Sequence, residues 1–307
     1  MEKTASSKQP YHIPALLPQA IELLDIKPNG IYIDATFGGG GHSRAILSLL
    51  NEEGRIYSFD RDLDAYENRI DDSRFTFVHG NFRHIENFMQ YYGVNKADGI
   101  LADFGVSFHH FDTPERGFSF RNEAPLDMRM NQKAGTTAAE LLAQADEKLL
   151  FEIFRDFADL KKTGAVVKAL INAKTVNPIE TTGDLAQAVA GALDSKQEKK
   201  ELAQVFQALR IAVNHENQDL RIFLNSTLNV LKPGGRLVTL TYHSMEDRLV
   251  KNFFKTGNIE GREEKDFYGN MASKWKLITR KPIEASEEEV LQNPRSRSAK
   301  LRAAELL

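Results

Sequence analysis

In DATFGGGGHS (Asp34–Ser43), four consecutive glycines stand between a β-favouring run at 30–35 and a helical pattern at about 43–51. Glycine lets the backbone adopt positive φ and pass close to a ligand without a steric cost. The N-terminus of a following helix offers unpaired N–H groups that favour an anionic group. This order of strand, glycine turn and helix predicts a ligand-binding turn at the edge of a sheet.

Further strand patterns follow the glycine turn. Residues 55–60, 75–78 and 99–104 are β-favouring runs separated by helical stretches, which is typical of βαβ units and predicts a parallel sheet. Asp60 ends the second run, about twenty residues beyond the glycines, where doubly wound sheets place an acid that binds ribose hydroxyls. The spacing of Gly38, Gly40 and Ser43 nearly matches the nicotinamide-dinucleotide fingerprint too, so the motif alone leaves the cofactor open.

The strand pattern is then interrupted. Residues 105–137 are loop-like, 138–231 show mainly helical spacing, and a strand pattern resumes at 236–242. Because this connection is far longer than an ordinary loop, we expect a helical domain inserted between the fourth and fifth strands. The last two strands are expected within 275–283 and 295–301. The predicted organisation is an α/β domain made of 1–110 and 210–307, with a mainly helical insertion at 111–209.

The composition narrows the class of protein. The chain has 307 residues, 41% of them hydrophobic, and no cysteine, which excludes disulfides and thiolate metal sites and fits a reducing compartment. A net charge of −3 argues against a protein that coats nucleic acid nonspecifically. No apolar stretch of about 18 residues occurs and the first thirty residues lack a signal-peptide core, so we expect a cytoplasmic protein that does not bind membranes or metals.

Nine segments, in order along the chain, resemble the RsmH (MraW) family of 16S rRNA cytosine-N4 methyltransferases. They are HIP (12–14), DATFGGGGHS (34–43), DRD (60–62), DGILADFGVS (98–107), ERGFSF (115–120), PLDMRM (125–130), FQALRI (206–211), YHSMEDR (242–248) and NPRSRSAKLR (293–302). The resemblance implies a Rossmann-like class I methyltransferase with a seven-stranded sheet and an inserted all-helical domain for substrate recognition.

The same resemblance implies an activity and its partners. The cofactor would be S-adenosyl-L-methionine, and the reaction N4-methylation of a cytosine in the decoding region of 16S rRNA, presented within the small ribosomal subunit. The implied protein is a monomer or homodimer without a DNA partner. The family's cofactor contacts, carried over position by position, fall on Gly40, Gly41, His42, Asp60, Phe82, Asp103 and His110.

One stretch, ADLKKTG (158–164), and two single positions depart from the family's pattern. His110 stands where the family usually has glutamine, so the glutamine contact with the cofactor would become a histidine contact here. Lys174 stands where the family usually has arginine, before NPIETT (177–182), and this change puts a contact with RNA in doubt. For His42 a helix-capping role, and for Phe82 plain core packing, remain open beside cofactor binding.

Three side chains are candidates for contact with the target amine. Asp103 ends the fourth strand, where ligands lie in sheets of this kind; binding of the cofactor alone, or capping of a turn, is the alternative role. Asp127 lies in a predicted loop, where an ion pair with Arg129 is the plainer reading. His243 follows the fifth strand and would orient the base or relay a proton, unless it is a hydrogen-bonded structural histidine.

Basic residues offer contacts with RNA, each with a plainer alternative. Arg295, Arg297, Lys300 and Arg302 alternate near the C-terminus, so some would face RNA phosphates if they do not merely form a solvated basic end. Arg210 would contact RNA or a carboxylate at a domain interface. Other functions also stay open: a DNA amino-methyltransferase, although ADFGV (102–106) lacks that group's prolines, a nicotinamide oxidoreductase, and a non-catalytic RNA-binding assembly factor.

Overall fold

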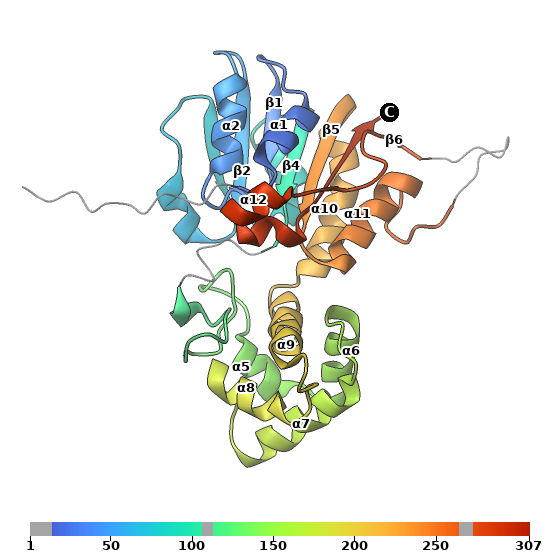
Figure 1. The fold of residues 1–307 in the computed structure, drawn as a ribbon. Helices are drawn as coiled ribbons and strands as arrows, with labels where there is room; N and C mark the ends of the chain where they lie inside the picture. The colour runs from blue at the N-terminus through green and yellow to red at the C-terminus, as the bar shows by residue number, and fades with distance from the viewer. Residues whose placement is uncertain (1–13, 106–112, 264–272) are drawn as a thin grey trace, which may run out of the picture. The chain divides into compact units, whose positions relative to one another are not determined.

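The computed structural model describes residues 14–105, 113–263 and 273–307. The chain forms two compact units, shown in Figure 1. The sheet unit comprises 1–105 and 220–307, and the helical unit comprises 106–219. The expected boundary at 209/210 lies inside a continuous helix, α9 (Glu198–Val213), whereas the contacts divide the chain at 105/106 and 219/220.

The sheet has the strand order β3-β2-β1-β4-β5-β8-β6, which confirms the predicted α/β class (Figure 1). Its first five members run parallel: β1 (Ile31–Asp34), β2 (Arg55–Asp60), β3 (Phe75–His79), β4 (Ala97–Asp103) and β5 (Leu231–Thr241). β8 (Lys300–Leu306) is antiparallel to β5. β6 (Trp275–Leu277) and the two-residue β7 (Ile283–Glu284) both pair with the other edge of β8, so the eight strands occupy seven positions.

Two strand boundaries differ from those expected. The last strand begins at Lys300, because Pro294–Ser298 form a short 3-10 helix instead of a strand. Proline has no N–H to give to a β-ladder, and the amide of Ser296 donates to Asn293 within this turn. β5 begins at Leu231, and the turn 232–235 is a bulge in its pairing with β4.

Alternating side chains of the strands build a core on each face of the sheet. Ile33, Ile100 and Leu237 pack on one face with the helices α3 (Ile85–Tyr91), α10 (Glu216–Val230) and α11 (Ser244–Thr256). The neighbouring residues Tyr32, Leu101 and Val238 pack on the opposite face with α1 (Leu17–Leu24) and α2 (Gly41–Leu49). Short helices η1 (Leu63–Asn68), η2 (Phe82–His84) and α12 (Glu287–Gln292) complete the unit together with the turn at 294–298. The burial of both faces explains why the central strands read as nearly continuous apolar runs.

The helical unit contains α5 (Ala138–Gln144), α6 (Glu147–Phe157), α7 (Thr163–Val176), α8 (Thr182–Ala190) and α9, preceded by the short η3 (Pro114–Arg116). Its own apolar core includes Leu150, Phe154 and Leu209. Two helices begin at capping boxes, Thr137 with Glu140 and Thr181 with Asp184, which satisfy the first free amides. These caps place the start of the helical region at Ala138, as the sequence predicts. Within the described residues, no helix is both long and apolar enough to cross a membrane.

Candidate functional site

The carboxyl ends of four adjacent parallel strands bring polar side chains together at one edge of the sheet unit. β2, β1, β4 and β5 are neighbours in this order, and they end at Asp60, Asp34, Asp103 and Thr241. In parallel α/β sheets, ligands bind outside this edge, close to the point where the strand order reverses. We call this group of strand ends, with the glycine turn that follows β1, the sheet edge.

The glycine turn has the backbone conformation that only glycine adopts easily. Gly40 is the N-cap of α2 at φ 77°, in the left-handed region, and a Cβ there would lie 2.8 Å from the ring of Phe37. A Cβ on Gly41 would lie 2.2 Å from Pro14, which covers the start of the helix. Phe37 and Pro14 therefore leave no room for a side chain at either glycine, and the backbone of the turn packs directly against them.

Asp60 holds the turn in place from the end of β2. Its Oδ2 accepts the amide of Gly38 at 2.8 Å, and its Oδ1 accepts the amide of Asp62 at 2.8 Å. Burial raises the pKa of Asp60 to about 6, against the lowering effect of these two amides. The carboxylate keeps further lone pairs, since each oxygen accepts more than one hydrogen bond. It can therefore brace the turn and still accept hydroxyl groups.

Asp34, the last residue of β1, lies beneath the turn and is fully buried. Its oxygens accept the Ser43 hydroxyl at 2.6 Å and the Thr36 amide at 3.0 Å, and the hydroxyls of Ser43 and Ser58 are 2.8 Å apart. Burial raises the pKa of Asp34 to about 6. This network ties β1, β2 and α2 together. This network was not predicted, although an acid at a strand end and a serine in the first turn of the next helix are its signals in the sequence.

Asp103 lies at the end of β4, as predicted, with its side chain 22% exposed. Its amide donates to Thr36 Oγ1 at 2.7 Å, and its Oδ1 accepts the hydroxyl of Tyr242 at 2.8 Å. Burial raises the pKa of Asp103 to about 7, and Asp34 and Glu246 add to this effect. A carboxyl group that titrates near neutrality, with one oxygen still accessible, can accept a hydrogen bond or a proton.

His42, in the first turn of α2, is only 4% exposed. Its Nδ1 is 3.8 Å from Asp103 Oδ2, and among the described residues none makes a hydrogen bond with its buried Nε2. Burial lowers the pKa of His42 to about 4, so the ring is neutral at pH 7. A buried imidazole nitrogen without a protein partner is suited to a polar group of a ligand. Thus Gly40, Gly41, His42, Asp60 and Asp103 all lie at the sheet edge.

Phe82 follows β3 in η2 and packs edge-to-face against Phe223 and Phe104, at centroid distances of 5.2 Å and 5.8 Å. The ring is half-buried and belongs to the edge of the core, so the packing interpretation is confirmed. This contact leaves the expected contact with adenine untested. His110, the seventh predicted cofactor contact, lies outside the described residues.

His243 caps α11. Its Nδ1 accepts the amide of Glu246 at 3.4 Å, and its Nε2 lies 2.9 Å from Glu246 Oε1. Glu246 also accepts the amide of Tyr242 at 3.0 Å. The helix start is thereby closed by contacts between residues three and four positions apart. These contacts are those of the structural histidine that the sequence analysis offered as the alternative.

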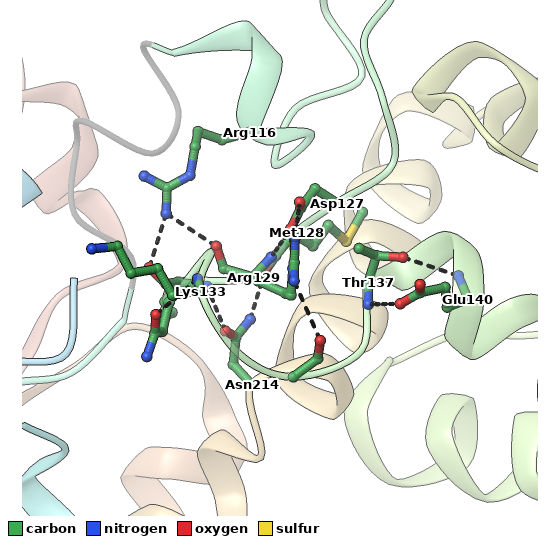
Figure 2. Close-up of polar contacts among 11 residues, drawn as sticks. Arg116, Asp127, Met128, Arg129, Lys133, Thr137, Glu140 and Asn214 are labelled. Carbon is green, nitrogen blue, oxygen red and sulfur yellow. Dashed lines mark hydrogen bonds and ion pairs between the residues drawn. The ribbon is translucent and has the colours of Figure 1, made fainter. Parts of the chain in front are cut away.

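Asp127 lies in the helical unit, where the guanidinium of Arg129 donates two hydrogen bonds to it, at 2.9 Å and 2.8 Å, and the Arg129 amide a third at 2.9 Å (Figure 2). Partial burial opposes ionisation, but the hydrogen bonds and charge of Arg129 lower the pKa of Asp127. Asn214 fixes the same loop by accepting the amide of Met130 at 2.8 Å and donating to the carbonyl of Met128 at 2.7 Å. The ion pair that the sequence suggested as the plainer reading is therefore present.

Three basic residues that the sequence singled out have partners within the protein. Arg302 is buried in β8 and forms two hydrogen bonds with Asp247 of α11, at 2.7 Å and 3.1 Å, so it is not one of the cations that alternation would direct toward RNA phosphates. Arg210 forms a bidentate pair with Glu216 at 2.9 Å and 3.0 Å. Lys174 donates to the carbonyls of Leu142 and Ala145 at the end of α5. Lys174 thus binds the last carbonyls of α5, as cations at a helix C-terminus do, while Arg302 and Arg210 pair with carboxylates of α11 and α10.

Comparisons with known proteins identify the family of the chain. The MraW methylase family matches residues 9–307. The ribosomal RNA small subunit methyltransferase H of Phocaeicola vulgatus is 54% identical over 301 residues, which cover 98% of this chain and 99% of that protein. The protein of the same name from Parabacteroides distasonis is 54% identical over 296 residues (96% and 97%), and that from Christiangramia forsetii 48% identical over 297 residues (97% and 98%).

Proposed function

The chain belongs to the MraW methylase family, and from this membership we propose that its sheet edge transfers a methyl group from S-adenosylmethionine to the N4 amine of a cytosine in 16S rRNA. The protein is a methyltransferase that depends on S-adenosylmethionine. The observation that carries the assignment of the site is Asp103: its carboxyl group lies beside the glycine turn, titrates near neutral pH and keeps one oxygen accessible.

The residues at the sheet edge fit an adenosyl group and its methionine. Gly40, the N-cap of α2, makes no side-chain capping hydrogen bond, so the first amides of this helix would favour a carboxylate. Asp60 has lone pairs left for ribose hydroxyls, and His42 has a buried nitrogen without a described partner. Phe82 would contact the base beyond β3, and His110 is proposed as a further contact. When bound, the cofactor supplies the electrophilic methyl group.

Asp103 is proposed as the acceptor for the target amine. The lone pair of the cytosine N4 is delocalised into the ring, so the amine must be held and its developing positive charge stabilised. A carboxylate within reach does both, by accepting an N–H while the amine attacks. We leave Asp127 and His243 out of this role, because Arg129 and the start of α11 already engage them. Positioning of the amine is the main contribution of the protein, since the reactive group belongs to the cofactor.

We propose the cytosine in the decoding region as the target, within the small ribosomal subunit. The names of the relatives place their substrate in small-subunit ribosomal RNA. The helical unit is proposed as the part that recognises this substrate, and the cytoplasm, where ribosomal subunits assemble, as the location. RNA is proposed over DNA because the prolines typical of DNA amino-methyltransferases are missing after β4. The protein is proposed to act as a monomer or a homodimer.

Two measurements test this proposal. Calorimetry should detect binding of S-adenosylmethionine to the folded protein and no binding of a nicotinamide dinucleotide. Mass spectrometry of rRNA nucleosides from cells with and without the gene should show loss of N4-methylcytidine in the deletion strain. An unchanged N4-methylcytidine signal would refute the substrate, and a protein without affinity for S-adenosylmethionine would refute the site.

A further inference from the structure

Tyr242 connects the end of β5 to Asp103, although the two residues are 139 positions apart in the sequence. Its hydroxyl donates to Asp103 Oδ1 at 2.8 Å. In the described part of the chain, this is the hydrogen bond that the carboxylate receives, and Oδ2 receives none; the nearest group to Oδ2 is His42 Nδ1 at 3.8 Å. The two oxygens of Asp103 are therefore not equivalent: one is held and the other is left open.

The position of Tyr242 is itself fixed on three sides. Its backbone follows Thr241 directly at the end of β5, and its amide donates to Glu246 Oε2 at 3.0 Å. The ring is half-buried and packs against the core on the α1 and α2 face of the sheet. On another side it meets the chain after β4, because a Cβ on Gly105 would lie 3.2 Å from its Cδ2. Gly105, at φ 117°, keeps this approach free of a side chain.

We propose that Tyr242 is a positioning residue for methyl transfer: it holds Oδ1 of Asp103 so that Oδ2 faces the target amine and accepts its proton. This inference rests on the proposed function, and it assigns a role to a residue that does not itself touch the substrate. A hydroxyl that donates to one carboxylate oxygen fixes the rotation of the carboxylate plane and leaves the second oxygen as the acceptor.

The charges around Asp103 explain why a neutral donor is needed. Burial raises the pKa of Asp103 to about 7, and the carboxylates of Asp34 and Glu246 raise it further, whereas the hydrogen bond from Tyr242 lowers it. His42 lies closest to Oδ2, and its ring is neutral at pH 7 because burial lowers its pKa to about 4. Burial first, and then the charge of Asp103, raise the pKa of Tyr242 well above its usual value, so the phenol keeps its proton and stays a donor.

The step that Tyr242 supports balances in atoms and electrons. The N4 lone pair of cytosine forms the new bond to the methyl carbon, while the electron pair of the breaking carbon–sulfur bond stays on sulfur. The amine nitrogen then carries an extra proton, which passes to Oδ2 of Asp103 and from there to solvent. The products are N4-methylcytosine, S-adenosylhomocysteine and one proton. Asp103 must be ionised before the step begins, because a carboxyl group that is already protonated cannot accept the proton of the amine.

Tyr242→Phe tests this role, since it removes the hydroxyl and keeps the ring. Turnover on small subunits should fall about 10- to 100-fold at pH 7, the cost of one hydrogen bond to a charged group. The acidic limb of kcat should move to higher pH by roughly one to two units, because the carboxylate loses its stabilising donor. KM for both substrates should stay within about twofold, as for a residue that acts through another.

Tyr91→Phe is the matched control, because that tyrosine is 81% exposed and remote from the strand ends. Its kcat and pH profile should equal those of the unchanged protein. Carboxyl-carbon NMR of Asp103 gives a readout without turnover: its titration should move to higher pH in Tyr242→Phe. If kcat, its pH profile and the titration are all unchanged, the proposal is overturned; a rise in KM for S-adenosylmethionine with normal kcat would also overturn it. Failure of the proposed function looks different, since the unchanged protein would then lack activity on small subunits.

Discussion

Asp103 and Asp127 are both aspartates that the sequence suggests as acceptors for the target amine, and the protein places them in opposite surroundings. Asp103, at the sheet edge, accepts a hydrogen bond from the hydroxyl of Tyr242. Burial raises its pKa to about 7, and the charges of Asp34 and Glu246 add to this effect. Asp127, in the loop before α5, accepts three hydrogen bonds from Arg129, and these bonds and the charge of Arg129 lower its pKa despite partial burial. The neutral hydroxyl beside Asp103 lets its carboxyl group take up a proton near pH 7, whereas the guanidinium of Arg129 keeps Asp127 ionised.

The difference extends to the neighbours of each residue. At the sheet edge, Asp34 and Asp60 likewise accept hydroxyls and backbone amides, and burial raises the pKa of each to about 6. In the loop, Asn214 and Arg116 instead donate to backbone carbonyls around Met128, which has φ 60°, a conformation that a residue other than glycine adopts at a cost (Figure 2). The carboxyl groups of the sheet edge therefore have raised pKa values, whereas the polar groups of the loop hold its backbone.

Asp103→Asn should have the largest effect. The amide cannot take a proton, so methyl transfer to small subunits should fall about 1,000-fold, within the range for loss of a positioned acceptor. Single-turnover assays with a labelled methyl donor measure this loss. Asp72→Asn is the control, because Asp72 pairs with Arg74 away from the strand ends, and it should leave the rate unchanged. A variant that keeps more than a tenth of the rate would remove Asp103 from the mechanism.

Asp34→Asn should change how stability depends on pH. The folded chain holds the proton of Asp34 more tightly than the unfolded chain, so this stabilisation is full below pH 3.8 and is lost as pH rises to about 6. The amide does not titrate. The free energy of unfolding of the variant, relative to the unchanged protein, should therefore rise by about 3 kcal/mol across this interval.

Urea titrations at pH 4 and pH 7 measure this difference. The single tryptophan, Trp275, lies in β6 and reports on the sheet unit. Parallel stability curves for the two proteins would show that Asp34 has the same proton affinity in the folded and unfolded chain.

Asn214→Ala should destabilise the helical unit by about 2 kcal/mol, because buried backbone groups of the loop lose their partners. Circular dichroism during urea unfolding would detect this loss, and the transition seen by Trp275 should stay in place. Asn214→Asp is the sharper comparison, since it keeps the acceptor for the Met130 amide but loses the donor to the Met128 carbonyl. If the unchanged protein, Asn214→Ala and Asn214→Asp are equally stable, the hydrogen bonds of Asn214 do not stabilise this loop.

Asp127→Asn should have the smallest effect on activity. Because Arg129 already occupies this carboxylate, turnover should change by less than about tenfold and the pH profile should not move, while stability falls by about 1 kcal/mol. Steady-state rates between pH 6 and pH 9 test this expectation. A 100-fold loss of turnover in a normally folded variant would show that Asp127, like Asp103, takes part in methyl transfer.

Several features of this protein can be predicted from residues that are neighbours in the sequence. The strand, the glycines and the helix at 30–51 are adjacent in sequence, and the steric demand at Gly40 is local, so the cofactor turn and the acid at Asp60 could be predicted. The long interruption between strand patterns likewise predicted an inserted helical unit. Helical spacing predicted a start near Ala138, and the structure explains this start by the capping box of Thr137 with Glu140, which acts over three residues.

The partners of side chains far apart in the sequence depended on the tertiary structure. Tyr242 reaches Asp103 because β5 pairs with β4 after an excursion of more than 100 residues, and Arg302 meets Asp247 because β8 lies antiparallel to β5. Periodicity shows which face a residue occupies, but strand order and register determine what stands opposite it. The sequence by itself thus determined where the glycine turn and the acids lie along the chain. Only the tertiary structure determined that Asp103 accepts the hydroxyl of Tyr242 and that Arg302 pairs with Asp247 inside the protein. These contacts form between different strands and helices, and not between neighbours along one element.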